Sequence, residues 1–541
     1  MLYILFSVII YIPVLLGFGS LFEKFFGKIS DGLSLKLLSG ILFLTTIYTI
    51  LSFLIPLNLS AEILTIIIGF GCFFYFKDHL EVLYFAQKNK FSILFGLIFI
   101  LFFASFPPFI LDHFGYYVPT IKWISEIGLV KGIGNLDLIL GQMSSWHILQ
   151  AGFSNFTDPF LKINAVALLI YYVYILEKKA WFHLCLMPIL FFFLQSPSPD
   201  LPAIAFSLII LQEILFKNNN CSLLFLFSIF IFTLKPTVVW LPIFVLLYSI
   251  FSVKTNLKFL LLGSFLMLFF IIKNLWTFGY PIFPMSILDL GITWKPNAGL
   301  MRISSETAIM KTYDMQFSIE QIQQFTFWEY IKNWFLLIGM KGIINSLLIF
   351  SLVIFTVYTF IKKKKILYFI WVAILFKSIL ILGFSAQYRF FLDVFFVIIF
   401  ILLYELFSKK WSLIFTGLFG FSIMIIFLFP SVIQKQFSSF RLGEFMQGFK
   451  KDQWKTPPEY SWNKSKSYTI GNLTFNVVQN YPFSFDTKLP AINPSFLYQY
   501  LETGIFPQKI GKDLKDGFVW RKLTEKEKIK LQEIVKTFEI E

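Results

Sequence analysis

Charged residues stand where long apolar runs of this sequence end, which is where chemistry at a membrane surface would need them. The acids are Asp112 and Asp200, and the cations are Lys235, Lys273 and Arg389. A carboxylate at the boundary of water and lipid can remove a proton from a hydroxyl group. Cations gathered near it can bind a phosphate or pyrophosphate. These residue types therefore predict transfer chemistry on a phosphate-containing substrate.

The segment from Leu111 to Trp146 is the centre of this hypothesis. It is polar and rich in glycine and aromatic residues, and it lies between apolar runs. A repeat of apolar residues every three positions follows Pro119, and its members are Ile121, Ile124, Ile127 and Val130. This spacing predicts a short amphipathic helix from Pro119 to Val130 that lies in the membrane interface. The fourth apolar run is expected to end at about Leu111.

Each charged residue also has a structural interpretation. Asp112 and Asp200 could each cap the helix that follows. Lys235 could extend its ammonium group to the interface, and Arg389 could pair with Asp393 four residues further along one helix. The residues alone leave both interpretations open.

The composition is that of an integral membrane protein. Of the 541 residues, 57% are hydrophobic and 14% are charged, and the mean hydropathy is +0.75. Soluble globular chains have about 45 to 50% apolar and about 25% charged residues. We therefore expect membrane lipid as a partner and no nucleic acid.

Apolar runs of roughly spanning length predict an all-α polytopic protein with about fourteen transmembrane helices. They start near Leu2, Leu35, Ala61, Phe91, Leu161, Trp181, Leu201, Ser222, Thr237, Phe259, Gly342, Ile366, Phe390 and Trp411. Lysine clusters follow the first, third, fifth, ninth, eleventh and thirteenth runs, so all of them fall on one side. The positive-inside rule makes that side cytoplasmic. The Asp112 segment and the C-terminal tail are then expected to face outward, in a bacterial inner (plasma) membrane.

Two domains follow from this pattern. Residues 1–433 form the transmembrane domain, with outer-face loops at residues 112–160 and 279–328. Residues 434–541 form a small extracytoplasmic α+β module. Within the module, the β-prone stretch from Ser467 to Val478 predicts strands, and the pattern from Thr524 to Phe538 predicts a helix.

Several motifs of the transmembrane domain form a recognisable set. In the Asp112 segment they are Asp112 with Tyr116, Pro119, IKWI at 121–124, Glu126 with residues 128–130, Gly132, Asn135 with Leu136, and residues 144–146. Further along they are SPSPDLP at 196–202, KNLWTFGYPIFP at 273–284 and YRF at 388–390. This set resembles a family of largely uncharacterised bacterial multi-spanning proteins. That family is in turn similar to the type C glycosyltransferases (GT-C), which use polyprenyl-phosphate sugars and keep an acid in the first large outer loop.

The resemblance implies a GT-C-like fold and a site on the outer face. Asp112 is the expected catalytic base. The expected substrate-binding residues are His113, Tyr116, Tyr117, Lys122, Asn135, Trp146, Asp200, Lys235, Lys273, Asn274 and Arg389. The donor would be a lipid-linked sugar and the acceptor an envelope glycan or lipid, with the need for a divalent metal left open. This chain departs from the pattern because His113 follows Asp112 where type C enzymes commonly have a second acid, and because the segment follows the fourth run rather than the first.

Two other classes of protein remain compatible with the sequence. A polysaccharide polymerase or ligase would also have many spans, but would use Arg and His in its outer loops rather than an acid at the end of a helix. A transporter would have paired interrupted helices in its two halves. The sequence shows no clear inverted repeat.

Overall fold

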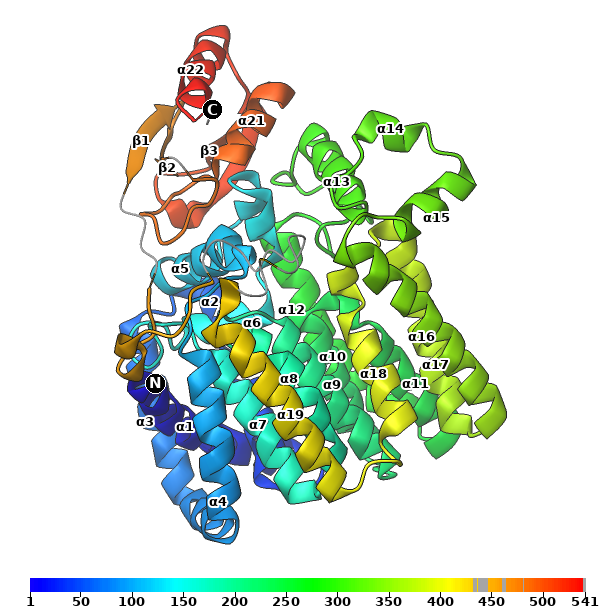
Figure 1. Ribbon diagram of the computed structural model, residues 1–541. Helices are drawn as coiled ribbons and strands as arrows, with labels where there is room; N and C mark the ends of the chain where they lie inside the picture. The colour runs from blue at the N-terminus through cyan, green and yellow to red at the C-terminus, as the bar shows by residue number, and fades with distance from the viewer. Residues whose placement is uncertain (432–434, 436–445, 460–463, 480, 539–541) are drawn as a thin grey trace.

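A computed structural model of the chain describes residues 1–431, 435, 446–459, 464–479 and 481–538. Its main part is a bundle of helices, and a small module of strands and helices from the C-terminal part packs on one end of that bundle (Figure 1). The prediction of a helical multi-pass chain with a small C-terminal region of strands is confirmed.

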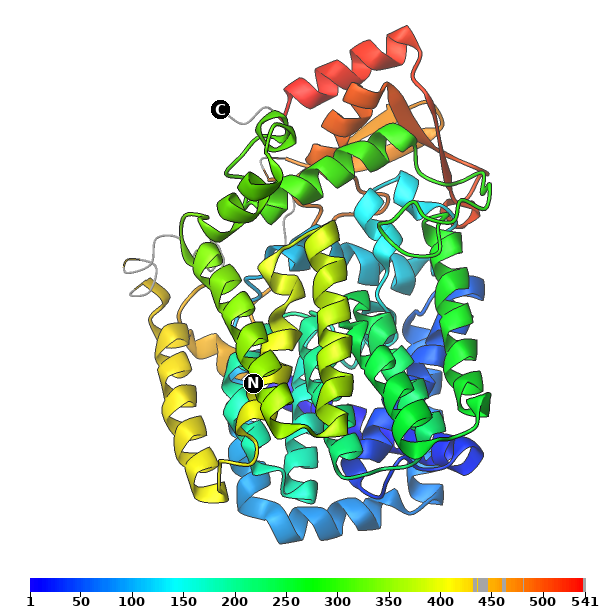
Figure 2. The same cartoon turned by 90° about the vertical axis from the view of Figure 1, so that its right-hand side faces the viewer.

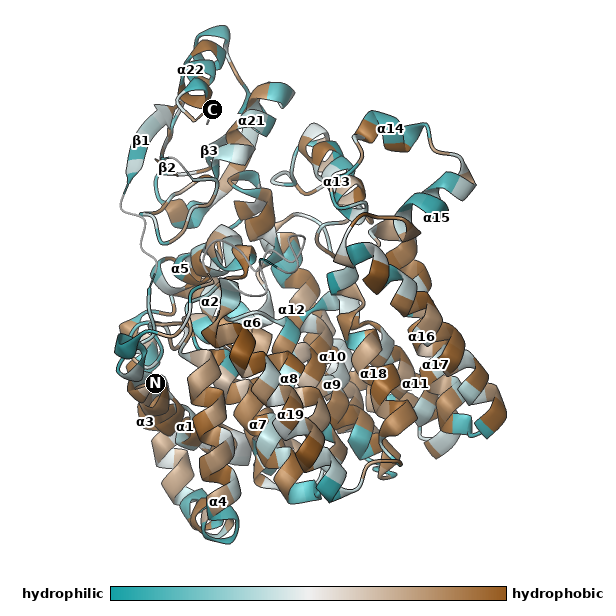
Figure 3. Ribbon diagram, viewed as in Figure 1, coloured by the Kyte–Doolittle hydropathy of each residue, from teal (hydrophilic) through white to brown (hydrophobic). Residues whose placement is uncertain are grey.

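Eight helical stretches in the described part of the chain are long and apolar enough to cross a membrane. They are α1 (Leu2–Phe26), α2 (Leu33–Leu54), α4 (Asp78–Ala104), α11 (Trp240–Leu247) with its flanking turns, α12 (Leu260–Thr277), α16 (Met340–Lys362), α17 (Lys365–Phe384) and α19 (Lys409–Leu428). Figure 3 shows apolar residues along these helices and polar residues at both ends of the bundle. The helices indicate a multi-pass membrane protein.

The remaining predicted runs form shorter helices, several of which lie inside the bundle. They are α3 (Leu59–Tyr75), α7 (Ile163–Lys178), α8 (Met187–Leu190) with its flanking turns, α9 (Asp200–Leu215), α10 (Cys221–Leu234) and α18 (Leu392–Leu403). Nearly every residue of α7, α9 and α10 is buried. A helix that is apolar on all sides is stable when other helices surround it. Length and composition thus support eight of the predicted spans.

The lysine clusters lie at one end of the bundle, which we call the lysine-rich end. Lys178, at the end of α7, donates from Nζ to the main-chain oxygen of Asp31, between α1 and α2, at 2.9 Å. Lys364, between α16 and α17, pairs with Glu405, after α18, at 3.1 Å. These contacts join loops that are far apart in the sequence.

The opposite end, which we call the Asp112 end, carries three segments (Figures 1 and 2). One is the Asp112 segment, with η1 (His113–Tyr117), α5 (Val118–Glu126), η2 (Ile133–Asn135), η3 (Leu138–Gln142) and α6 (Ser145–Ala151). Another lies between α12 and α16 and contains α13 (Ala298–Thr312), α14 (Ile319–Gln323) and α15 (Phe327–Phe335). The C-terminal module is the third.

The boundaries of the Asp112 segment differ from the prediction. The helix α4 ends at Ala104 rather than near Leu111. The cause is the pair Pro107 and Pro108, because proline has no N–H to continue a helix and restricts the residue before it. The following short helix ends at Glu126 rather than at Val130, because Gly128 turns the chain with a φ of +92°.

The apolar side of α5 is covered by protein rather than facing lipid. Pro119, Ile121, Trp123 and Ile124 are buried, and the ring of Trp123 lies 5.9 Å from that of Phe518 in the C-terminal module. The helix therefore holds the module on the bundle.

The C-terminal module consists of two hairpins and two helices. The strands β1 (Ser465–Ile470) and β2 (Leu473–Val478) pair in antiparallel fashion, as do β3 (Ile505–Lys509) and β4 (Phe518–Lys522). The helices are α21 (Pro494–Thr503) and α22 (Glu525–Lys536). Both the predicted strands after Ser467 and the predicted C-terminal helix are confirmed, and Thr524 caps α22 in a capping box with Glu527.

Buried polar contacts fasten this module to the Asp112 segment. Asn493 donates from Nδ2 to Asp137 Oδ2 at 2.7 Å, and the Tyr500 hydroxyl donates to the main-chain oxygen of Asn135 at 2.8 Å. Buried polar groups are costly to leave unpaired. The module and the segment therefore depend on each other for their positions.

Candidate functional site

Asp112 and Arg389 form an ion pair at the Asp112 end. Asp112 Oδ2 accepts a hydrogen bond from Arg389 Nη1 at 3.0 Å. The Asp112 side chain is 35% exposed and that of Arg389 is 43% exposed, so a solute can reach the pair. The alternative pair between Arg389 and Asp393 does not form, because Asp393 pairs with Lys377 instead.

A second ion pair lies beside the first. Lys235 pairs with Asp200 Oδ1, and its Nζ also donates to the main-chain oxygen of Arg389 at 3.3 Å. This lysine therefore links the two pairs. We call Asp112, Asp200, Lys235 and Arg389 the Asp112 cluster.

The local sequence explains the positions of Asp200 and Lys235, the two members of the second pair. Asp200 is the first residue of α9, where the helix dipole favours an acid. The Ser198 hydroxyl donates to Asp200 Oδ2 at 2.9 Å and fixes the direction of that carboxylate. Lys235 ends α10 in an extended conformation (φ −148°, ψ 101°) because Pro236 follows it.

Arg389 lies in η9 (Tyr388–Phe390), the turn before α18. Its Nε donates to Gln387 Oε1 at 3.2 Å, and its guanidinium group lies 5.1 Å from the centre of the Phe390 ring. Burial lowers the pKa of Arg389, while the nearby Asp112 carboxylate raises it, and the net change is upward. The guanidinium group is therefore always charged.

Two tyrosines of η1 lie behind the cluster. The rings of Tyr116 and Tyr117 are 4.6 Å apart, and the Tyr117 ring is also 4.6 Å from that of His147. Burial, and then the charges of Asp112 and Asp200, raises the pKa of Tyr117. Burial lowers the pKa of His147 to about 3. These three side chains are therefore uncharged near neutral pH, and the two tyrosines carry hydroxyl groups.

Sequence reasoning missed Lys311 of α13. Burial lowers the pKa of Lys311, the nearby Arg389 lowers it further, and Asp112 opposes the change. This lysine is thus a third cation within electrostatic range of Asp112. Its position in a polar loop far from any other site residue hid it in the sequence.

A buried ion pair deeper in the bundle was also missed. Lys377 of α17 pairs with Asp393 Oδ1, and Trp240 of α11 donates from Nε1 to Asp393 Oδ2 at 2.8 Å. The Lys377 side chain is fully buried. The pair, with Trp240, ties together α17, α18 and α11, and Arg389 and Lys235 stand just before α18 and α11 in the chain, so it helps to position the cluster.

Two predicted residues of α12 lie outside the Asp112 cluster. Lys273 donates from Nζ to the main-chain oxygens of Gln142 at 3.0 Å and Met143 at 2.8 Å. Asn274 donates from Nδ2 to the main-chain oxygen of Pro281 at 2.7 Å. Both side chains are buried and hold loops in place.

Four residues of the Asp112 segment are also not brought into the cluster. The buried His113 packs against Phe114, and Trp146 donates to Asn164 Oδ1 at 2.8 Å. Lys122 donates to the main-chain oxygen of Asp486, and Asn135 donates to that of Trp294 at 2.7 Å. Of the predicted site residues, the structure therefore groups Asp112, Asp200, Lys235 and Arg389, with Tyr116 and Tyr117 behind them.

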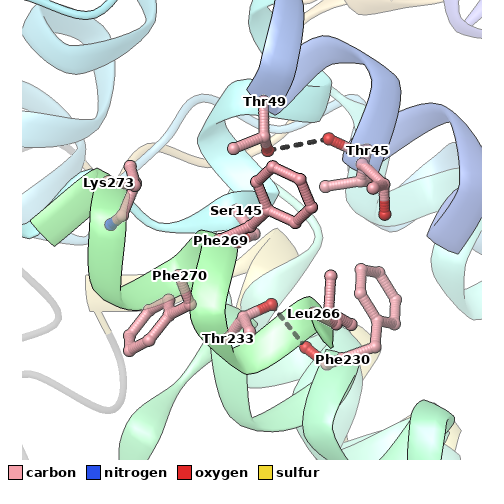
Figure 4. A pocket seen from close by; sticks show the side chains of 10 residues that line it. Thr45, Thr49, Ser145, Phe230, Thr233, Leu266, Phe269, Phe270 and Lys273 are labelled. Atoms are coloured by element: carbon pink, nitrogen blue, oxygen red, sulfur yellow. Dashed lines mark hydrogen bonds between the residues drawn. The ribbon is translucent and has the colours of Figure 1, made fainter. Parts of the chain in front are cut away.

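Two cavities in the described part of the chain lie away from this cluster. One, of about 20 Å³, holds about one water molecule and is lined by Lys273, threonines and phenylalanines (Figure 4). The Thr49 and Thr233 hydroxyls donate to main-chain oxygens of their own helices (Figure 4). The other, of about 390 Å³, lies where Leu54 and Glu126 face Lys515. Among the described residues, no group of three His, Cys, Asp or Glu side chains could hold a metal ion.

The fold and the cluster define a multi-pass helical membrane protein with a charged site at one end. The family described as "Domain of unknown function (DUF8201)" matches residues 1–396, and the chain belongs to this family. No curated protein and no solved structure matches the chain. All four residues of the Asp112 cluster lie inside the matched region, and the C-terminal module lies outside it.

Proposed function

We propose that this chain is a glycosyltransferase-like membrane protein that moves a sugar from a polyprenyl-phosphate donor to an envelope glycan or lipid acceptor at the Asp112 end. The observation that carries the proposal is the accessible Asp112–Arg389 ion pair, with Lys235 bonded to the same arginine. A transferase of this kind needs a carboxylate base and a cation for the leaving phosphate within one site.

Arg389 has two roles in the proposed reaction. In the free protein it pairs with Asp112. When the donor binds, the guanidinium group forms bidentate hydrogen bonds to the phosphate, and Lys235 binds the same phosphate. Asp112 is then released from its partner and can accept a proton.

The bond changes are those of a simple displacement. The acceptor oxygen bonds to the anomeric carbon of the sugar, and the bond from that carbon to the phosphate oxygen breaks. The electron pair leaves with the polyprenyl phosphate, whose charge Arg389 and Lys235 stabilise, and the hydroxyl proton goes to Asp112. The partly exposed Tyr116 would donate a hydrogen bond from its phenol to the sugar, and the buried Tyr117 would support its ring.

The charge balance of the cluster supports this role. Asp112 and Asp200 offset Arg389 and Lys235, so the cluster itself is neutral. A phosphate that displaces Asp112 from Arg389 adds negative charge, and Lys311 is within range to offset it. The site is thus suited to an anionic ligand that arrives and leaves.

The proposal includes a topology of about fourteen passes, with the shorter helices counted as spans. The lysine-rich end would face the cytoplasm and the C-terminal module the outside of a bacterial plasma membrane. A phosphatase reporter and a fluorescent-protein reporter, each fused after Glu541, test this orientation. Activity of the phosphatase with a dark fluorescent protein is expected, and the reverse pattern would overturn it.

Turnover by purified protein in lipid nanodiscs tests the function. A polyprenyl-phosphate-linked sugar, labelled in its sugar, is supplied with candidate acceptors. Transfer of the label to an acceptor is expected. Lengthening of an existing glycan chain as a block would indicate a polymerase or ligase instead. In sealed liposomes, passage of intact donor across the membrane without cleavage would indicate a transporter.

A further inference from the structure

The helix α15 has a strongly two-sided surface. Glu329, Lys332 and Asn333 lie on its polar side, as helical spacing of the sequence FWEYIKNWF requires. The aromatic and aliphatic residues share the other side. A capping box between Thr326 and Glu329 fixes the start of the helix.

Among the residues that the structure describes, one edge of the apolar side packs against protein and the other edge is exposed. Trp334 is buried and donates from Nε1 to the main-chain oxygen of Ala386 at 3.0 Å. On the other edge, Phe327 is 71% exposed and Trp328 is 75% exposed, with Ile331 beside them. This is too much apolar area on one short helix to be left in water.

The exposed edge continues into the wall of the bundle. Leu336 and Ile338, in the link to α16, are both exposed. Ile343 and Leu347, in the first turns of α16, are exposed as well. The apolar residues of α15 therefore join the surface that a spanning helix presents to lipid.

The length of α16 fixes the level of α15. With 23 residues and a rise of about 1.5 Å per residue, α16 is about 34 Å long. The hydrocarbon core of a bilayer is about 30 Å thick. Met340 thus lies at the boundary of that core, and α15, which ends five residues before it at Phe335, lies at the same boundary.

We propose that α15 is an interfacial helix that inserts Phe327, Trp328 and Ile331 into the lipid leaflet at the Asp112 end. Aromatic residues favour this depth because their rings are apolar and tolerate the polar headgroup region. The occupant of the exposed edge is the bilayer itself, in which α16 is embedded, and not a second protein.

The inserted helix is also connected to the site. Trp334 bonds to Ala386, and the Ala386 N–H donates to Thr312 Oγ1 at 3.2 Å. Arg389 follows Ala386 by three residues, in η9. The lipid contact therefore sets the height of Arg389 above the bilayer, independently of which reaction the cluster performs.

Spin labels on the full chain in lipid nanodiscs test the proposal. Cys72, Cys185 and Cys221 are first replaced by Ala, since all three are free. Trp328→Cys and Ile331→Cys then carry a label on the apolar edge, and Lys332→Cys carries it on the polar side as the matched control. Collision rates with oxygen, which concentrates in lipid, and with a water-soluble nickel chelate are measured for each.

The two apolar-edge labels should collide severalfold more with oxygen and severalfold less with the chelate than the Lys332→Cys label, at a depth of about 5 to 10 Å. Equal access of the chelate at all three positions would overturn the proposal. So would dipolar broadening between labels at Trp328→Cys, which would mean that a second copy of the chain covers this edge. The use of two apolar-edge variants keeps the test valid if one of them does not fold.

Discussion

Asp112 Oδ2 and Arg389 Nη1 are 3.0 Å apart although the residues are 277 positions apart in the chain. Asp112 stands at the start of η1, and Arg389 stands in the turn between α17 and α18. Their contact joins two distant parts of the transmembrane domain at a place that solvent reaches. Ion pairs at such places are weak and exchange readily with other anions. The pair therefore suits a site where a phosphate replaces the carboxylate.

Arg389→Ala should weaken the binding of polyprenyl phosphate by about tenfold to a hundredfold, because hydrogen bonds to charged groups contribute about 1.5 to 3 kcal/mol. Titration of the purified protein with polyprenyl phosphate measures the dissociation constant. Asp112→Asn should bind at least as tightly as the parent, since Arg389 no longer has a competing carboxylate. Arg302→Ala is the matched control, because this arginine lies on α13 and pairs only with Glu306 among the described residues. Parental affinity of Arg389→Ala would contradict the exchange.

The sequence predicted the members of the cluster but not their pairing. Acids and cations at the ends of apolar runs are visible because such charges are costly near lipid. The partner of each charge depends on which helix ends meet, and helix packing over 277 positions leaves no local signal. Sequence spacing allowed Arg389 to pair with Asp393, whereas in the structure Asp393 pairs with Lys377. Lys377 was missed because it stands inside an apolar run without any local partner.

Partners that depend on packing also explain why some predicted residues lie outside the Asp112 cluster. Lys273, Asn274 and Asn135 are polar residues near helix ends, as the members of the cluster are. Their partners are main-chain oxygens of neighbouring loops. Only the course of those loops decides whether such a side chain faces a ligand or a carbonyl group.

Lys377→Met should lower the free energy of unfolding by about 3 to 5 kcal/mol, because it leaves the buried Asp393 carboxylate without a cation. The double variant Lys377→Met with Asp393→Asn should recover most of this loss, since an asparagine still accepts from Trp240. Thermal unfolding in detergent measures both. Equal melting temperatures of the parent and Lys377→Met would show that the pair does not position these helices.

Asp137 should make the stability of the protein depend on pH. Burial raises the pKa of Asp137 from 3.8 to about 7, opposed by the hydrogen bonds from Ile139 and Asn493. The folded protein therefore binds a proton that an unfolded aspartate has released, and the free energy of unfolding falls as the pH rises from about 4 to about 7. Asp137→Asn should lessen this fall by a few degrees in melting temperature. Identical melting curves at pH 5 and pH 8 for parent and variant would contradict this assignment.

Sugar transfer by Asp112→Asn in lipid nanodiscs tests whether Asp112 accepts the proton of the acceptor hydroxyl. General base catalysis contributes about 10² to 10⁴ in rate. Turnover of the labelled lipid-linked sugar should fall by that factor, while the donor binds at least as tightly as to the parent and the melting temperature stays at the parental value. Glu126→Gln, which changes an exposed acid of the same segment, should keep parental turnover. Parental turnover by Asp112→Asn would rule out a role of Asp112 as base and leave this aspartate as a partner of Arg389 without a part in catalysis.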